Sequence, residues 1–167
     1  MGPNEISGLP AHVLLVHLVL AAVPVAAIVL IVTALWPAAR RRLGIITPLI
    51  ALGALLTVPV TTHAGHWLQA RVAMTPLIRK HVNLGKWVLP WMVALFVVAV
   101  LVWVWDRSGR ASADRSRRGS RLHGTIGKVV VAVLTIAVSV GAVQQVVRTG
   151  EAGSRALWTG NFSAQPR

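Results

Sequence analysis

The chain has 167 residues, of which 55% are hydrophobic, and its formal net charge is +13. A soluble domain of this size needs far more polar surface, and the absence of cysteine excludes disulfides, thiolate metal sites, iron–sulfur clusters and covalently attached haem. No motif that reads nucleic acid accompanies the basic charge, so we expect no nucleic-acid partner.

Four long stretches without Asp, Glu, Lys or Arg dominate the chain. Each stretch is long enough for a helix to cross ~30 Å of hydrocarbon. The sequence therefore predicts an all-α integral membrane four-helix bundle, with the lipid bilayer as its first partner. The predicted spans are residues 11–36, 45–66, 84–105 and 125–147, which lie within one transmembrane domain at 11–158.

The segments between the spans indicate how the bundle is oriented. Residues 1–10 are a polar lead-in without the basic residues of a signal peptide, and residues 159–167 form a tail. Short Arg-rich loops stay in the cytoplasm, so Arg40–Arg42 places the loop after the first span inside. Residues 106–124 carry six Arg among Ser and Gly, and predict a flexible basic cytoplasmic loop. Ten Lys and Arg near the inner loops, against seven outside, predict both termini on the outer side.

Folding these spans into a bundle with short loops brings five of the six histidines to the outer end. They are His12, His17, His63, His66 and His81. Imidazole is a good ligand for haem iron, copper and zinc, and a b-type haem needs no cysteine. The group therefore predicts a haem b held between two histidines, or a zinc or copper ion. The alternative is that the histidines form interhelical hydrogen bonds and bind no cofactor.

Within this group, His17 lies several residues inside an apolar run, where an ionisable side chain is costly without a partner. His63 and His66 are three residues apart and share one helix face. For a metal ion we expect His63, His66 and His81 as ligands, with Glu151 as a carboxylate partner. Glu151 is also three residues from Arg148, and a surface ion pair between them is the simpler interpretation.

A short internal repeat links two of the predicted spans. TTHAG at residues 61–65 and TGEAG at residues 149–153 share the pattern T-x-x-A-G. Both segments follow a span that runs from inside to outside. Matched helix ends in two hairpins suggest a duplicated hairpin.

Several motifs, in the same order, resemble a family of predicted bacterial membrane proteins called domain of unknown function 2231. The resemblance extends from about residue 8 to about residue 158. The motifs are GLPAHVLLVH at 8–17, WPAARRRLG at 36–44, TTHAGHWL at 61–68, HVNLG at 81–85 and LPW at 89–91.

The resemblance implies four spans, a multi-pass location in the bacterial cytoplasmic membrane, and no established activity. Relatives usually have histidine at His12, His17 and His81, often have it where Glu151 stands, and vary at His63 and His66. We therefore expect His17 and His81 as the axial pair of a haem, with His12, His63 and His66 as second choices. The family is similar in size and histidine placement to small haem-b membrane cytochromes, which is an analogy of fold alone.

The sequence predicts a redox protein for electron transfer, with a redox or membrane-complex protein as partner and no catalytic residues. Two alternatives stay open. One is a structural or accessory subunit of a membrane complex, and the other is a small histidine-gated transporter or ion sensor. Hydrolase and nucleotide chemistry have no support, because no H-E-x-x-H, phosphate loop or paired carboxylates occur.

Overall fold

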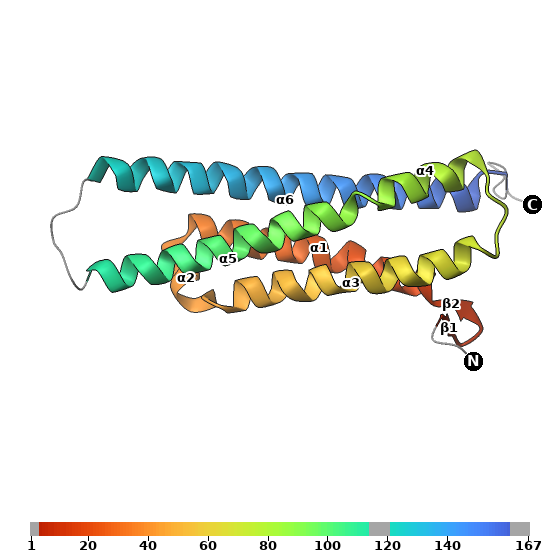
Figure 1. Cartoon of the computed structure of the whole chain (residues 1–167), viewed down its shortest axis with the longest axis horizontal. Helices are drawn as coiled ribbons and strands as arrows, with labels where there is room; N and C mark the ends of the chain where they lie inside the picture. Colours follow the sequence, from red (N-terminus) through yellow and green to blue (C-terminus); the bar gives the residue numbers. More distant parts are fainter. Residues whose placement is uncertain (1–3, 114–120, 161–167) are drawn as a thin grey trace, which may run out of the picture.

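The computed structural model describes residues 4–113 and 121–160, and nearly all of them are helical (Figure 1). Four helical stretches are long and apolar enough to cross a membrane, as predicted. They are Ala11–Leu35, Ile46–Gln69, Pro76–Ser108 and Ile126–Trp158. The side of the membrane that each end faces stays a prediction.

The first hairpin begins with two short antiparallel strands, β1 (Glu5–Ile6) and β2 (Leu9–Pro10), that the sequence did not predict. The long helix α1 (Ala11–Leu35) follows and is succeeded by the short helix α2 (Pro37–Leu43). Proline at the first position of α2 costs no hydrogen bond there. The guanidinium of Arg40, in α2, donates to the carbonyls of Thr33 and Ala34. The arginine that we interpreted as a topology signal therefore also caps the end of α1.

Helix α3 (Ile46–Gln69) extends the second predicted span, so the TTHAG segment is helical. Between the second and third predicted spans, the chain forms a further helix, α4 (Pro76–Gly85). Thr75 explains where α4 starts, because its side chain accepts a hydrogen bond from Ile78 N at 3.2 Å. Proline at the next position is preorganised for a first helical turn.

Helix α5 (Val88–Ala113) carries the third span, and the chain bends between α4 and α5. Pro90 accounts for the bend: it has no N–H to bond the carbonyl of Lys86, and its ring crowds that carbonyl. Helix α6 (Arg121–Trp158) carries the fourth span. The prediction of an irregular loop over residues 106–124 is therefore wrong for 106–113 and 121–124, which are helical, whereas 114–120 lie outside the described residues. Residues 148–158, which follow the predicted fourth span, are also helical.

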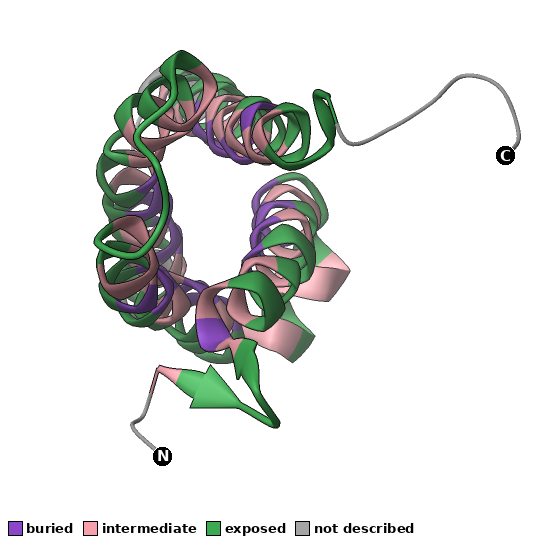
Figure 2. Ribbon diagram, turned by 90° about the vertical axis from the view of Figure 1, so that its right-hand side faces the viewer, coloured by how far each residue is buried: buried purple, intermediate pink, exposed green. Residues whose placement is uncertain are grey.

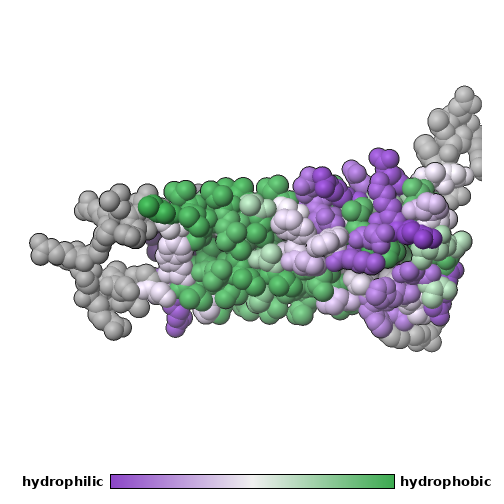
Figure 3. Space-filling view, turned by 45° about the horizontal axis from the view of Figure 1, so that its top comes forward, coloured by the Kyte–Doolittle hydropathy of each residue, from purple (hydrophilic) through white to green (hydrophobic). Residues whose placement is uncertain are grey.

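The four long helices form a ring in the order α1, α3, α5, α6, and α4 packs against α6. Figure 2, which looks along the bundle, shows buried residues on the inward faces of the helices. The centre contains Val23, Leu30, Met92 and Leu95, none of which exposes any surface. On the face drawn in Figure 3, an apolar surface covers the part of the bundle away from α4, and hydrophilic side chains gather at the end that carries α4. We call this end, which also holds His12 and His81, the histidine end.

The two hairpins repeat one another, as the T-x-x-A-G pattern suggested. Buried positions of α1 recur at one constant spacing in α5, and those of α3 recur at another constant spacing in α6. The ring order is also unchanged when α1 exchanges with α5 and α3 with α6. The bundle thus has an approximate twofold axis along its length. The matched buried pairs are Val19 and Val88, Val23 and Met92, Leu30 and Ala99, Thr47 and Thr135, Ala54 and Ala142, Val58 and Val146, and Ala64 and Ala152.

One matched position breaks the repeat and leaves a polar atom without a partner. In the first hairpin, the hydroxyls of Thr33 and Thr47 share a hydrogen bond of 2.8 Å. In the second, Thr135 matches Thr47, but Val102 stands where Thr33 would be. Within the described chain, the Thr135 hydroxyl is buried with no hydrogen-bond partner. An unpaired buried hydroxyl costs about 1–3 kcal/mol.

We predict that Val102→Thr stabilises the protein by about 0.5–1 kcal/mol, because the new hydroxyl gives Thr135 a partner across the α5–α6 contact. Thr33→Val should have the opposite effect, since it removes the existing bond and orphans Thr47. Both can be measured as shifts in the unfolding midpoint in detergent. A loss of stability in Val102→Thr would contradict the equivalence of the two positions.

Candidate functional site

His12 and His81 are brought together at the histidine end by two equivalent hydrogen bonds. The Nδ1–H of His12, in the first turn of α1, donates to the carbonyl oxygen of Thr61 on α3 at 2.9 Å. The Nδ1–H of His81, on α4, donates to the carbonyl oxygen of Thr149 on α6, also at 2.9 Å. The two ring centroids are 6.1 Å apart, and the rings are inclined at 74°. Each bond joins the two helices of one hairpin, and the pair of rings lies where the two hairpins meet.

Each T-x-x-A-G segment forms the surface against which one imidazole packs, and we call this surface the seat of that histidine. Its threonine supplies the accepting carbonyl, and its alanine is buried. Its glycine lies beneath the ring: a Cβ on Gly65 would be 3.0 Å from Nδ1 and Cε1 of His12, and a Cβ on Gly153 would be 3.0 Å from the same atoms of His81. Such contacts are tighter than ordinary packing allows. Glycine therefore lets each ring approach the helix closely enough to reach the carbonyl.

The threonine hydroxyls of the two seats also match. The Thr61 hydroxyl donates to the Thr57 carbonyl at 2.7 Å, and the Thr149 hydroxyl donates to the Gln145 carbonyl at 2.8 Å. Both hydroxyls are thus occupied within their own helices. Only the backbone carbonyl of each threonine serves the histidine.

These hydrogen bonds determine which nitrogen of each ring is available. A carbonyl can only accept, so Nδ1 must carry the proton, and in a neutral imidazole Nε2 then carries the lone pair. Within the described residues, neither Nε2 has a hydrogen-bond partner. Two imidazoles with N–H groups fixed by carbonyls and with free Nε2 atoms match the arrangement around histidines that bind metals in proteins.

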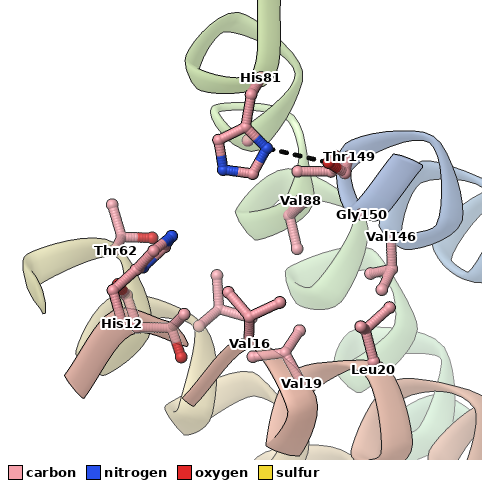
Figure 4. Close-up of a pocket in the computed structure, with 13 residues that line it drawn as sticks. His12, Val16, Val19, Leu20, Thr62, His81, Val88, Val146, Thr149 and Gly150 are labelled. Atoms are coloured by element: carbon pink, nitrogen blue, oxygen red, sulfur yellow. Dashed lines mark hydrogen bonds between the residues drawn. The ribbon is translucent and has the colours of Figure 1, made fainter. Parts of the chain in front are cut away.

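A pocket of about 90 Å³ lies between the two rings and the valines below them (Figure 4). Its walls again come in matched pairs. Val19 and Val88 are equivalent, as are Val58 and Val146, whereas Val16 is matched by Gly85 and Thr62 by Gly150. The lining is thus mainly apolar, and its polar members are the two histidines and three threonines. The pocket is large enough for an ion together with one or two small ligands of the size of water.

The other predicted histidines do not join this pair. His17 is exposed, and its Nδ1 is bonded to the Val13 carbonyl of its own helix at 2.7 Å. His63 and His66 are exposed on α3, and Glu151 is exposed on α6. In the described part of the chain, no three metal-ligating side chains come close enough to hold one ion. The structure therefore brings His12, not His17, to His81, and it does not assemble His63, His66, His81 and Glu151 into one site.

Sequence reasoning identified the repeated pattern and both histidines but did not connect them. The connection has a sequence signal: each hairpin has one histidine near the start of its first helix and one T-x-x-A-G near the end of its second. No family model, curated protein or solved structure matches this chain. The resemblance to the uncharacterised family therefore stays a prediction.

We predict that Gly65→Ala and Gly153→Ala each displace the imidazole above them and break its bond to threonine. NMR of ¹⁵N-histidine-labelled protein should show the loss of the slowly exchanging Nδ1 proton, and stability should fall by about 1 kcal/mol.

Gly53→Ala is the matched control, because a Cβ at this position of α3 meets nothing within 4 Å. It should leave the histidine signals unchanged and raise helix stability by up to about 1 kcal/mol. Equal effects of Gly53→Ala and Gly65→Ala would show that the glycines matter for helix propensity alone.

Proposed function

We propose that this multi-pass membrane protein binds one transition-metal ion between Nε2 of His12 and Nε2 of His81, and that it serves electron transfer. The observation that carries the proposal is the pair of free Nε2 atoms on rings whose centroids are 6.1 Å apart. Two metal–nitrogen bonds of about 2.0–2.1 Å place their nitrogens about 4 Å apart across one ion. Rings at the observed separation are compatible with that span when both Nε2 atoms turn toward the ion.

Copper is the ion that this donor set favours. Affinities of nitrogen sites for divalent ions of the first transition row peak at copper, and imidazole suits both of its common oxidation states. A structural zinc site needs about four protein ligands, and the described residues offer two at this position. Bound copper would supply a one-electron couple at the histidine end.

Haem b meets the requirement for two axial histidines but not the requirement for space. Pockets for organic ligands usually measure about 300–1,000 Å³. The space between His12 and His81 is about 90 Å³, and Val16 and Val88 close it below. A single ion therefore fits this arrangement better than a macrocycle.

The residues of the chain would prepare this site in three ways. The carbonyls of Thr61 and Thr149 fix the tautomer and the orientation of each imidazole. Gly65 and Gly153 set the height of each ring above its helix. The valines limit the entry of water, which strengthens electrostatic interactions in the pocket.

A second function is favoured by the same hydrogen bonds. His12 and His81 fasten α1 to α3 and α4 to α6, and a purely structural protein needs nothing more from them. This is the structural or accessory subunit that the sequence left open. The two functions differ in their use of Nε2, which only the metal site requires.

Substitution by asparagine separates these functions, because its amide N–H lies near the position of Nδ1 and no ligand replaces Nε2. We predict that wild-type protein in neutral detergent takes up about one copper ion per chain. His12→Asn and His81→Asn should fold with nearly unchanged stability and lose more than about 100-fold in copper affinity. His17→Asn should bind copper as the wild type does.

The measurements are metal analysis and electron paramagnetic resonance of the copper-loaded protein, in which two nitrogen ligands give a resolved splitting. Oxidised and dithionite-reduced absorption spectra of the same samples test for haem. A haem band that disappears in His12→Asn but not in His17→Asn would place haem rather than an ion at this pair. Copper binding that is absent from the wild type, or unchanged in His12→Asn, would refute the metal site and leave the structural function.

We further propose that the protein lies in the bacterial cytoplasmic membrane with the histidine end outside, as Arg40–Arg42 and the resemblance support. A donor or acceptor of electrons would then approach from the outer side.

A further inference from the structure

A second, larger hollow lies on α4, away from the histidine pair. It measures about 540 Å³ and is open to the surroundings. Its lining combines cationic, amide and apolar side chains from the short helix and from the turn that joins it to α5. The lining residues are Pro76, Arg79, Lys80, Asn83, Leu84 and Trp87, and we call this hollow the α4 groove.

The polar side of the α4 groove is arranged for an anion. Arg79 and Lys80 are exposed neighbours on its wall, and no ion pair engages either of them within the described residues. Lys86 lies just beyond the groove, and its Nζ donates to Asn83 Oδ1 at 3.3 Å. Because that bond occupies the amide oxygen, Asn83 presents its NH₂ group as a donor. The groove thus offers two cations and an amide donor, with a third cation close by.

The other side of the α4 groove is apolar and leads onto the membrane-spanning surface. Trp87 is 62% exposed at the boundary between α4 and the span, where tryptophan anchors proteins at the headgroup level. On the adjoining helix α5, Leu89, Val93 and Val97 are exposed and share one helix face. A ligand with an anionic head and hydrocarbon chains can therefore occupy the groove and continue along α5.

The opposite face of α4 is fixed to α6, so the groove has a rigid back. His81 donates to the Thr149 carbonyl, and Gln145 Nε2 donates to the Leu84 carbonyl at 2.8 Å. Both bonds come from the side that faces the bundle. A ligand in the groove would therefore meet a preformed surface and would not have to order the helix.

We infer that the α4 groove binds the phosphate headgroup of an anionic phospholipid, with its acyl chains along α5. Clusters of Lys and Arg next to a membrane span attract anionic lipid by about 1 kcal/mol per charge. A free phosphate ion would use the same cations but gains nothing from Trp87 or from the apolar strip. The inference is independent of the metal site, since it uses neither Nε2 atom.

Native mass spectrometry of the full-length protein in neutral detergent tests the inference. The probes are phosphatidylglycerol, zwitterionic phosphatidylcholine with the same acyl chains, and inorganic phosphate. We expect the wild type to retain phosphatidylglycerol in preference to phosphatidylcholine. Arg79→Ala/Lys80→Ala should bind phosphatidylglycerol about 30-fold more weakly, which corresponds to the loss of two charges.

Arg148→Ala/Arg155→Ala is the matched control, because it removes the same charge from exposed positions of α6 outside the groove. It should bind phosphatidylglycerol as the wild type does. An equal loss in both double variants would show general charge attraction and overturn the site. Unchanged binding in Arg79→Ala/Lys80→Ala, or displacement of the lipid by an equal concentration of phosphate, would overturn it as well.

Discussion

The hydrogen bond from a histidine Nδ1–H to the main-chain carbonyl of a neighbouring helix organises the histidine end. Helices in a bilayer gain little from apolar burial against one another, so close packing and polar contacts have to hold them in register. Here the contact is made twice, from His12 to Thr61 and from His81 to Thr149. Each bond uses a glycine beneath the ring and a main-chain carbonyl of the neighbouring helix. These requirements explain why the same short pattern stands near the end of α3 and of α6.

Because the hairpin is repeated, two histidine contacts of the same kind lie next to each other and together line one pocket. A single histidine that packs on its glycine and bonds to the threonine carbonyl joins two helices and leaves its Nε2 atom without a partner among the described residues. Two seats related by an approximate twofold axis bring both unused nitrogens to the same place, with matched valines below them. The proposed metal function thus needs no ligand beyond those that the helix contacts already position. The repeat is imperfect where Val102 faces Thr135, which shows that the two halves have diverged inside the core.

The four spans could be predicted from the sequence because length and apolarity alone determine them. The T-x-x-A-G repeat was also visible. The sequence could not show which histidine lies next to His81, because that depends on the rotation of each helix about its axis. His17 lies on the exposed side of α1, and His12 lies on the side that faces α3. Helix α4 was missed since its residues are too polar for a span, although Thr75 and Pro76 carry a helix-start signal. The length of α6 was missed for a similar reason: its last turns pack on α4 and do not need to be apolar.

The bend at Pro90 makes the two halves of the histidine site mechanically different. His12 belongs to the continuous helix α1, so its backbone can shift only if a whole span shifts with it. His81 belongs to a helix that the bend separates from its own span and that is held chiefly by α6. The pocket therefore has one wall on a helix that continues into the membrane-embedded bundle and one wall on a separate short helix that packs on α6. The distance between the two imidazoles is therefore set by the docking of α4 on α6 as well as by the packing of the four spans.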